Sequence, residues 1–196
     1  MAKFVRVTSP VGSASYPWLM DPDTKFDKDG IYSCNIYVDK DAAKDLVEKI
    51  DKAYDANIAD TKTATGKDKI KPGPKPYELG DDNRYLFKIK QKAKIGESSI
   101  RPTVVNAKGK QLTNVSVYGG SEVKVAMDLV PYFVATTGAG ITLRLIGVQI
   151  LKLQEKPMPS LDTLGFKEED GYDGEDAEVE ETKDKVEKSE ASDDFI

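Results

Sequence analysis

The chain has 196 residues with 34 acidic and 29 basic side chains, a formal net charge of −5. It contains one cysteine and no histidine, which excludes an internal disulfide, histidine-based catalytic triads and histidine-ligated metal sites. No stretch approaches the roughly 20 apolar residues of a membrane span, and the start of the chain lacks the apolar run of a signal peptide. We therefore expect one cytosolic domain with no cofactor and no enzymatic activity.

The charge is distributed unevenly along the chain. Residues 168–196 contain 14 acidic residues and three lysines, whereas the preceding 167 residues contain 26 basic and 20 acidic ones. The net charge thus averages a basic body and a strongly acidic tail. This asymmetry is typical of a nucleic-acid-binding protein with an acidic interaction tail.

The first part of the chain predicts two strands separated by a loop. Residues 3–8 are expected to form a short strand. Residues 9–30 are rich in proline and glycine, which predicts a long ordered loop. The alternation in residues 31–38 predicts a strand. One face of that strand is apolar (Tyr32, Cys34, Ile36, Val38) and the other polar (Ser33, Asn35, Tyr37).

The pattern then changes to a helical period. Apolar residues spaced by three and four predict an amphipathic helix over about 41–58, capped by Asp39 or Asp41 and fading near Asp60. Residues 61–84 are rich in lysine, proline and glycine, which predicts a mobile basic loop. Its segment from Lys62 to Lys75 is either a solvated insertion or a source of phosphate contacts.

The remainder of the body is predicted to be β-structure. Strands are expected from Arg84 onward and over residues 100–105, 111–118, 122–134 and 141–153, with turns at 106–110 and 138–140. Five or six strands with one helix predict a mainly β protein built on a small barrel. The expected domain spans residues 1–155, followed by a linker over 156–167 and a disordered acidic tail over 168–196.

A row of lysines follows one face of the strand that starts at Arg84. Side chains alternate along a strand, so the lysines project about 7 Å apart from one face; they are Lys88, Lys90, Lys92 and Lys94. Lysines are easily left in water, so a solvated outer face is one interpretation. Because no acid separates them and like charges repel, an anionic partner is the other.

Tyr132 is the main candidate for stacking on a base. It shares the polar face of its strand with Lys124, and an aromatic ring beside a lysine suits base stacking, although the same ring could cap the barrel end. Tyr37, on a polar strand face, and Trp18, in the early loop, are weaker stacking candidates.

The chain closes on an acidic and apolar sequence. The last four residues are Asp193, Asp194, Phe195 and Ile196. The tail is either a solubilising segment or a mimic of nucleic acid that docks a partner. Its apolar end favours the second interpretation.

Several segments together resemble a known family. They are Val104–Lys110, Tyr118–Ser121, Val123–Val125 and Leu129–Tyr132, supported by Lys71–Tyr77, Phe87–Lys90, the start of the chain and the acidic tail. In order and spacing they are similar to the single-stranded DNA-binding protein of short-tailed T-odd bacteriophages, over most of the chain.

This resemblance implies an OB-fold Greek-key barrel of five to six strands carrying one amphipathic α-helix. It implies a homodimer that coats single-stranded DNA in replication, recombination and repair, and promotes annealing, in the cytoplasm of the infected bacterial host. The acidic tail is expected to contact the phage DNA polymerase and primase-helicase. By position, the DNA-contacting residues of the family fall on Lys3, Lys90 and Tyr132.

The chain also departs from the family pattern. A lysine of the family is Ala126 here, a family arginine corresponds to Asp29, and Ile196 follows the terminal aromatic residue. The DNA-binding residues expected overall are Lys3, Trp18, Tyr37, Lys88, Lys90, Lys92, Lys124 and Tyr132.

Three other functions remain open from the residues alone. The barrel could bind or anneal RNA. A comparison of deoxy and ribo oligomers of one sequence would distinguish this function from DNA binding, because only RNA has a 2′-hydroxyl. The protein could be an adaptor whose tail recruits partners without nucleic acid. A metal-dependent nuclease using Asp81, Asp82 and Asp128 is a weaker possibility, because these acids come from unrelated segments.

Overall fold

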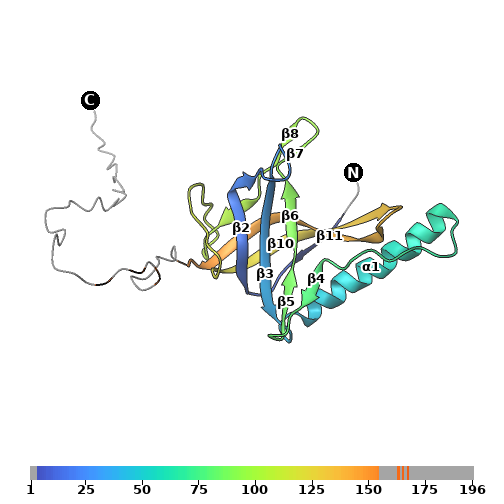
Figure 1. Cartoon of the computed structure of the whole chain (residues 1–196), viewed down its shortest axis with the longest axis horizontal. Helices are drawn as coiled ribbons and strands as arrows, with labels where there is room; N and C mark the ends of the chain where they lie inside the picture. Colours follow the sequence, from blue (N-terminus) through green and yellow to red (C-terminus); the bar gives the residue numbers. More distant parts are fainter. Residues whose placement is uncertain (1–3, 155–162, 164, 166, 168–196) are drawn as a thin grey trace, which may run out of the picture. The chain divides into compact units, whose positions relative to one another are not determined.

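The computed structural model describes residues 4–154, 163, 165 and 167. The chain divides into two units, Met1–Lys156 and Pro157–Ile196, and every named helix and strand lies in the first. The elements are β1 (Val5–Thr8), β2 (Gly12–Asp23), β3 (Ile31–Asp39), α1 (Lys44–Thr65), β4 (Tyr77–Leu79), β5 (Arg84–Phe87), β6 (Ile89–Lys92), β7 (Lys94–Ile95), β8 (Ser98–Ser99), β9 (Thr103–Val105), β10 (Glu122–Val134) and β11 (Gly138–Lys152) (Figure 1).

Five strands form a closed ring in the order β2, β3, β6, β11, β10. The ring closes because β2 pairs with β3 at five positions between Ser13 and Asp23 and with β10 at Gly12 and Ser13. All pairs in the ring are antiparallel except β6 with β11, which is parallel. The remaining paired strands extend this sheet, apart from the small β7–β8 hairpin. The predicted OB-fold barrel with one helix is confirmed.

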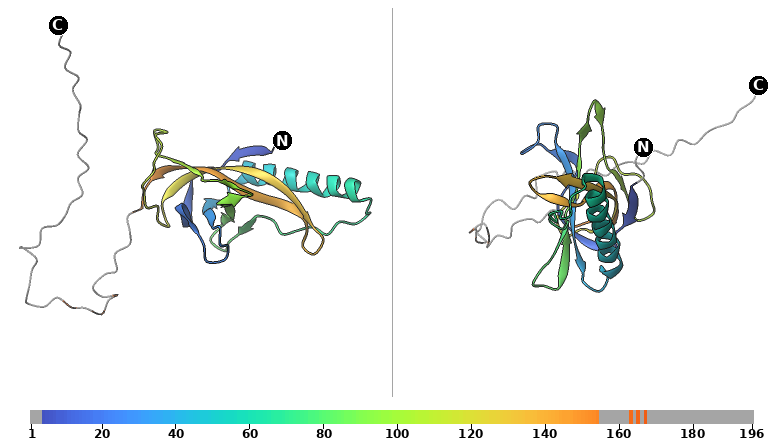
Figure 2. Two further views of the ribbon diagram at one scale, coloured as in Figure 1. Left: turned by 90° about the horizontal axis from the view of Figure 1, so that it is seen from above. Right: turned by 90° about the vertical axis from the view of Figure 1, so that its right-hand side faces the viewer.

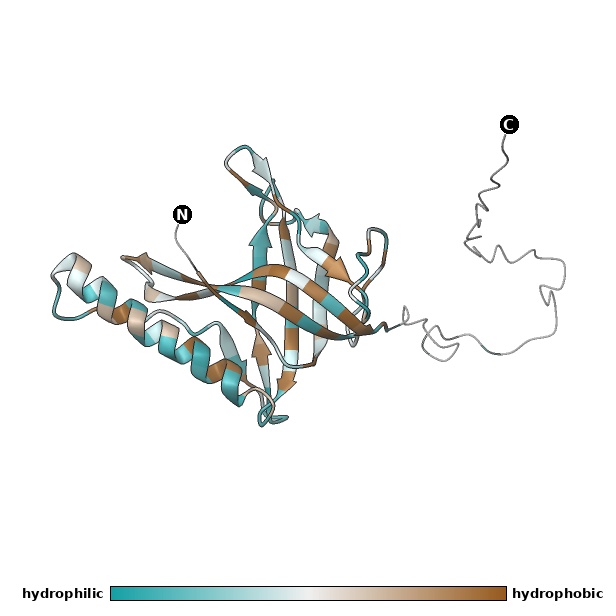
Figure 3. Cartoon of the chain, turned by 180° about the vertical axis from the view of Figure 1, so that it is seen from behind, coloured by the Kyte–Doolittle hydropathy of each residue, from teal (hydrophilic) through white to brown (hydrophobic). Residues whose placement is uncertain are grey.

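The interior of the barrel is filled by the apolar faces of these strands. The predicted alternation in β3 is confirmed: Tyr32, Cys34, Ile36 and Val38 are buried, while the residues between them are half-buried. Phe87 and Met127 are also completely buried. Burial of each large apolar side chain stabilises the folded state by roughly 1.5–3 kcal/mol. Burial raises the pKa of Cys34 to about 12, so this thiol belongs to the core. Figure 3 shows the resulting mixture of hydrophobic and hydrophilic bands along the strands.

Helix α1 packs one face against the hairpin formed by β10 and β11. Its buried residues are Leu46, Ile50, Tyr54 and Thr61. The helix and the turn of this hairpin extend together from one end of the barrel (Figures 1 and 2). No helix in the described part of the chain is long and apolar enough to span a membrane.

The predicted ends of the helix were wrong. Its N-cap is Ala43, which has no side-chain acceptor, and Asp41 lies two residues earlier, where it pairs with Lys44 (Oδ1 to Nζ, 2.9 Å). The helix continues to Thr65 and ends at Gly66, which is left-handed with φ of 64°. The apolar pattern stops near Ile58, but tertiary packing that buries Thr61 supports a further turn.

The predicted loop over residues 9–30 is largely a strand, β2. Pairing with β3 is interrupted between Ser15 and Trp18 by a bulge that contains Tyr16 and Pro17. The bulge accommodates a proline, which cannot donate to a ladder, and Tyr16 takes a positive φ of 46°. The prolines and glycines of this segment therefore indicated a loop where the structure has a strand.

The predicted mobile loop over residues 61–84 is also structured. It contains the end of α1 and strand β4, and its middle is hydrogen-bonded to the start of β11. The Gly73 amide donates to the Ala139 carbonyl at 2.7 Å, and the Ala139 amide donates to the Lys71 carbonyl at 3.0 Å. The loop is thus held against the β10–β11 hairpin.

Two further predictions, a strand over residues 111–118 and a turn over residues 138–140, were wrong. Residues 111–118 form no strand beyond one bridge between Val105 and Gln111. Residues 138–140 belong to β11, and the turn lies at 135–137. Gly138 is required by close packing, because a Cβ there would lie 2.2 Å from the carbonyl oxygen of Lys71.

Candidate functional site

The predicted lysine row lies on the outside of the barrel. Phe87, Ile89 and Gln91 are buried, whereas the lysines between and after them are exposed. We call Lys88, Lys90 and Lys92 the lysine face. This face has neighbours from distant segments, since Lys90 pairs with Ser33 of β3 on one side and with Arg144 of β11 on the other. Side chains of paired residues share a face, so Arg144 adds to the positive charge there.

Acids from neighbouring segments pair with most of these lysines. Lys88 contacts Glu78 (Nζ to Oε1, 2.6 Å) and Lys92 contacts Asp27 (Nζ to Oδ2, 3.3 Å). The hydrogen bond from the Asp29 amide and, next, the contact with Lys92 lower the pKa of Asp27. Exposed ion pairs of this kind are weak and can exchange for phosphates. Among the described residues Lys90 has no ionic partner.

Tyr132 and the lysine face share a groove. One pocket of about 340 Å³ is lined by Lys75, Lys88, Lys90 and Tyr132, with prolines and residues of β11. A second pocket of about 280 Å³ shares Lys90 and Thr142 with the first, and adds Lys92, Arg144 and apolar side chains. We call these two adjoining pockets the basic groove. They bring together four of the predicted residues.

The position of Tyr132 is set by contacts from other elements. A Cβ at Gly140 would lie 2.7 Å from the Tyr132 hydroxyl, and a Cβ at Gly73 would lie 2.6 Å from it, so the ring occupies space left by two glycines. The Asn57 side-chain amide donates to the carbonyls of Tyr132 and Gly140 at 2.9 and 2.8 Å. Helix α1 therefore holds the backbone of the hairpin beneath this ring.

Tyr132→Ala should weaken binding of single-stranded nucleic acid by about 5- to 150-fold, the loss expected for one stacked base. The half-buried ring is not part of the core, so the melting temperature should stay close to that of the unaltered protein. Gly140→Ala should also weaken binding, because the added methyl group displaces the ring. Fluorescence anisotropy and thermal melts measure both effects.

Phe133→Ala is the matched control for Tyr132. Phe133 is 42% exposed and is the next residue along β10, where side chains alternate between faces. We expect no change in affinity for this variant. A collapse of the melting temperature in Tyr132→Ala would show instead that the ring caps the barrel.

Lys75 is positioned by a network at the edge of the groove. Its Nζ lies 2.8 Å from the Asp51 carboxylate and 3.0 Å from the Tyr77 hydroxyl, which itself donates to Asp51 at 2.6 Å. The hydrogen bonds to Asp51 and then to Tyr77 raise the pKa of Lys75 above its usual value. Lys75 therefore stays charged at neutral pH. The sequence placed it only within a basic loop.

Arg144 was missed by the sequence analysis. Its guanidinium lies over the ring of Phe4 at 4.4 Å and 3.9 Å from Asp128. Arg6 makes two hydrogen bonds to the same carboxylate, at 2.7 and 3.1 Å. The cluster of two arginines and one acid retains a positive charge. The sequence signal that could have identified it is a charged residue in the middle of the apolar segment 141–148.

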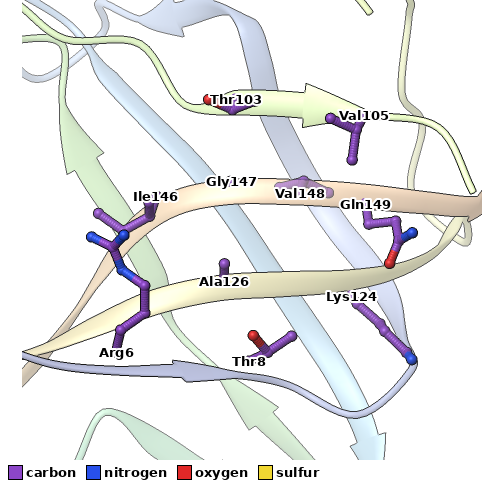
Figure 4. A pocket seen from close by; sticks show the side chains of 10 residues that line it. All are labelled: Arg6, Thr8, Thr103, Val105, Lys124, Ala126, Ile146, Gly147, Val148 and Gln149. Atoms are coloured by element: carbon purple, nitrogen blue, oxygen red, sulfur yellow. The ribbon is translucent and has the colours of Figure 1, made fainter. Parts of the chain in front are cut away.

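Lys124 lies outside the basic groove. It lines a separate pocket of about 410 Å³ on the outer side of β10 and β11, with Arg6, Thr8, Thr103 and Gln149 among its other residues (Figure 4). Figure 4 shows β1 and β9 on either side of this pocket, with Ala126 and Gly147 between them. Lys124 and the lysine face thus belong to two different surfaces.

The other two predicted aromatic residues differ in their surroundings. Trp18 pairs with Ser33, which pairs with Lys90, so Trp18 lies two strands from the lysine face and is 46% exposed. Tyr37 is half-buried, and the guanidinium of Arg84 lies over its ring at 5.0 Å. One side of the Tyr37 ring is therefore already covered.

Lys3 and the four terminal residues, Asp193 to Ile196, lie outside the described residues.

Two of the three acids considered for a metal site form ion pairs with arginines. Asp82 pairs with Arg84, and Asp128 pairs with Arg6. In the described part of the chain, no cluster of three acidic or cysteine residues could hold a metal ion.

Comparisons with known proteins agree with this geometry. The profile of a family described as "Single-stranded DNA-binding protein, Bacteriophage T7" matches residues 11–153. The crystal structure of gp2.5, a single-stranded DNA-binding protein encoded by bacteriophage T7, is 26% identical in sequence and has a TM-score of 0.73. The match covers 87% of this chain and 98% of that one.

Two structures from another phage share the fold. The single-stranded DNA-binding protein from bacteriophage Enc34 in complex with single-stranded DNA is 21% identical, with a TM-score of 0.60, covering 76% of this chain and 88% of that one. The same protein without DNA is 20% identical, with a TM-score of 0.57, covering 76% and 82%. No curated protein matches the chain.

Proposed function

The chain belongs to the family of the single-stranded DNA-binding protein of bacteriophage T7, and from this premise we propose that it binds single-stranded DNA along the basic groove without reading base sequence. The observation that supports this most is the joining of Tyr132 with Lys75, Lys88 and Lys90 in one groove. Lysines contact phosphates, which carry no sequence information, and every base offers a face for stacking. We assign the protein no catalytic role.

The salt dependence of binding tests this proposal. Labelled oligo-dT, a mixed-sequence oligomer and its ribonucleotide equivalent are titrated with the full-length protein, and binding is followed by anisotropy. The two DNA oligomers should bind with similar affinities. If Lys75, Lys88, Lys90 and Lys92 each neutralise one phosphate, log affinity should fall with log salt with a slope of about −3.

The other outcomes identify other functions. Tighter binding of the ribonucleotide oligomer would favour an RNA-binding or annealing module. Absence of oligonucleotide binding at low salt would favour a protein adaptor. An affinity that is insensitive to salt would contradict phosphate neutralisation by lysines.

We further propose that the acidic tail recruits the phage DNA polymerase and primase-helicase, and that the protein acts as a homodimer in the cytoplasm of the infected host. The 14 acidic residues in 168–196 and the terminal Phe195 support a docking role. Phe195→Ala should weaken contact with these partners and leave DNA affinity nearly unchanged. Equal loss of both activities would contradict the docking role of Phe195.

A further inference from the structure

An exposed aromatic residue, Phe26, lies in the loop between β2 and β3, next to the acid that pairs with Lys92. Phe26 is 85% exposed, although its side chain has no polar group to place in water. The ammonium group of Lys25 lies over its ring, 5.3 Å from the centroid. An exposed ring with a cation beside it matches the elements that hold a stacked base and its phosphate.

The loop that carries Phe26 is anchored at both ends. The Lys25 amide donates to the Asp23 carboxylate at 2.9 Å, and the Asp29 amide donates to the Asp27 carboxylate at 3.1 Å. The Gly30 amide closes a turn on the Asp27 carbonyl at 2.9 Å. The exposure of Phe26 is therefore built into an ordered loop.

The same loop is tied to the lysine face. Asp27, the residue after Phe26, pairs with Lys92 at 3.3 Å, and Asp29 pairs with Lys94 at 3.9 Å. Lys92 lines the pocket that adjoins the Tyr132 pocket. Tyr132 lines one pocket with Lys88 and Lys90, whereas the loop that carries Phe26 is joined to Lys92 through Asp27. Lys92 follows Lys88 by four positions, about 13 Å along a strand.

We infer that Phe26, with Lys25, forms a second base-stacking position that continues the basic groove beyond Lys92. Bases stack at both ends of the lysine face, on Tyr132 and on Phe26, while the intervening phosphates contact the lysines. This inference rests on the proposed function and adds to it a position for the bound strand. Continuity with the groove favours a nucleobase over an apolar protein partner as the occupant.

Substitutions at Phe26 separate stacking from simple apolar contact. Affinity for labelled oligo-dT is measured by anisotropy, with thermal melts for each variant. Phe26→Leu keeps an apolar side chain but removes the aromatic ring, and should weaken binding about 5- to 150-fold. Phe26→Tyr keeps the ring and should retain the affinity. Full affinity in Phe26→Leu would overturn the inference.

A relocated tryptophan gives a second readout. The chain contains one tryptophan, so Trp18→Phe with Phe26→Trp places the only indole at position 26. Its fluorescence should be strongly quenched by oligo-dT. The control combines Trp18→Phe with Leu153→Trp, at a position that is 44% exposed and lies on the order of 30 Å along the chain from Arg144. Its fluorescence should not change.

The outcomes also distinguish this inference from the proposed function. If the unaltered protein binds oligo-dT while the indole at position 26 is not quenched, the second stacking position is wrong and the proposed function remains. If the unaltered protein does not bind oligo-dT in the anisotropy assay, both are wrong.

Discussion

Lys90→Gln should weaken binding of single-stranded DNA by about tenfold, the loss expected for one hydrogen bond to a charged group. It should also make the slope of log affinity against log salt less steep by about 0.7, corresponding to one phosphate. Lys90 lies in both pockets of the basic groove and has no ionic partner among the described residues. Its charge is therefore available to DNA without breaking an ion pair.

Two further variants test this explanation of Lys90. Lys49 is exposed on α1 and lines neither pocket of the basic groove, so Lys49→Gln should change neither affinity nor slope. Glu78→Gln removes the acid that pairs with Lys88 and should tighten binding, because Lys88 is then released to a phosphate. If Lys49→Gln weakens binding as much as Lys90→Gln, overall charge would explain the effect and the groove would not.

Deleting residues 168–196 should tighten binding of single-stranded DNA by about tenfold at low salt. The deletion removes 14 acids and three lysines. A tethered anion competes with DNA at an effective concentration in the millimolar range, and this competition is screened by salt. The difference between the full-length and truncated proteins should therefore shrink as salt is raised. Titrations with oligo-dT at two salt concentrations measure it.

A tail of the same length with its acids replaced by amides separates charge from chain length. The protein with this neutral tail should bind DNA as tightly as the truncated protein does. Weaker binding by the truncated protein would show that the tail contributes to the DNA interface and does not compete with it.

Strands whose residue pattern depends only on neighbouring positions in the sequence were predicted well. The alternation in β3 and β6 identified the buried and exposed faces, because neighbouring side chains in a strand point in opposite directions. The bounds predicted for β10, 122–134, match the structure. The β2 strand was missed because Pro17 lies in a bulge that depends on pairing with β3. The end of α1 was misjudged because the helix buries Thr61, a polar residue that the apolar pattern does not include.

The candidate site was only partly predictable. The sequence by itself determined the basic body, the acidic tail and the outward row of lysines, since these follow from composition and from a period of two. Only the tertiary structure decided that Tyr132 shares a groove with Lys88 and Lys90 while Lys124 does not. It also decided that Glu78 and Asp27 pair with two of the lysines. Such neighbours are set by which strands pair and in which register, and the pattern within a single strand carries no record of its partner.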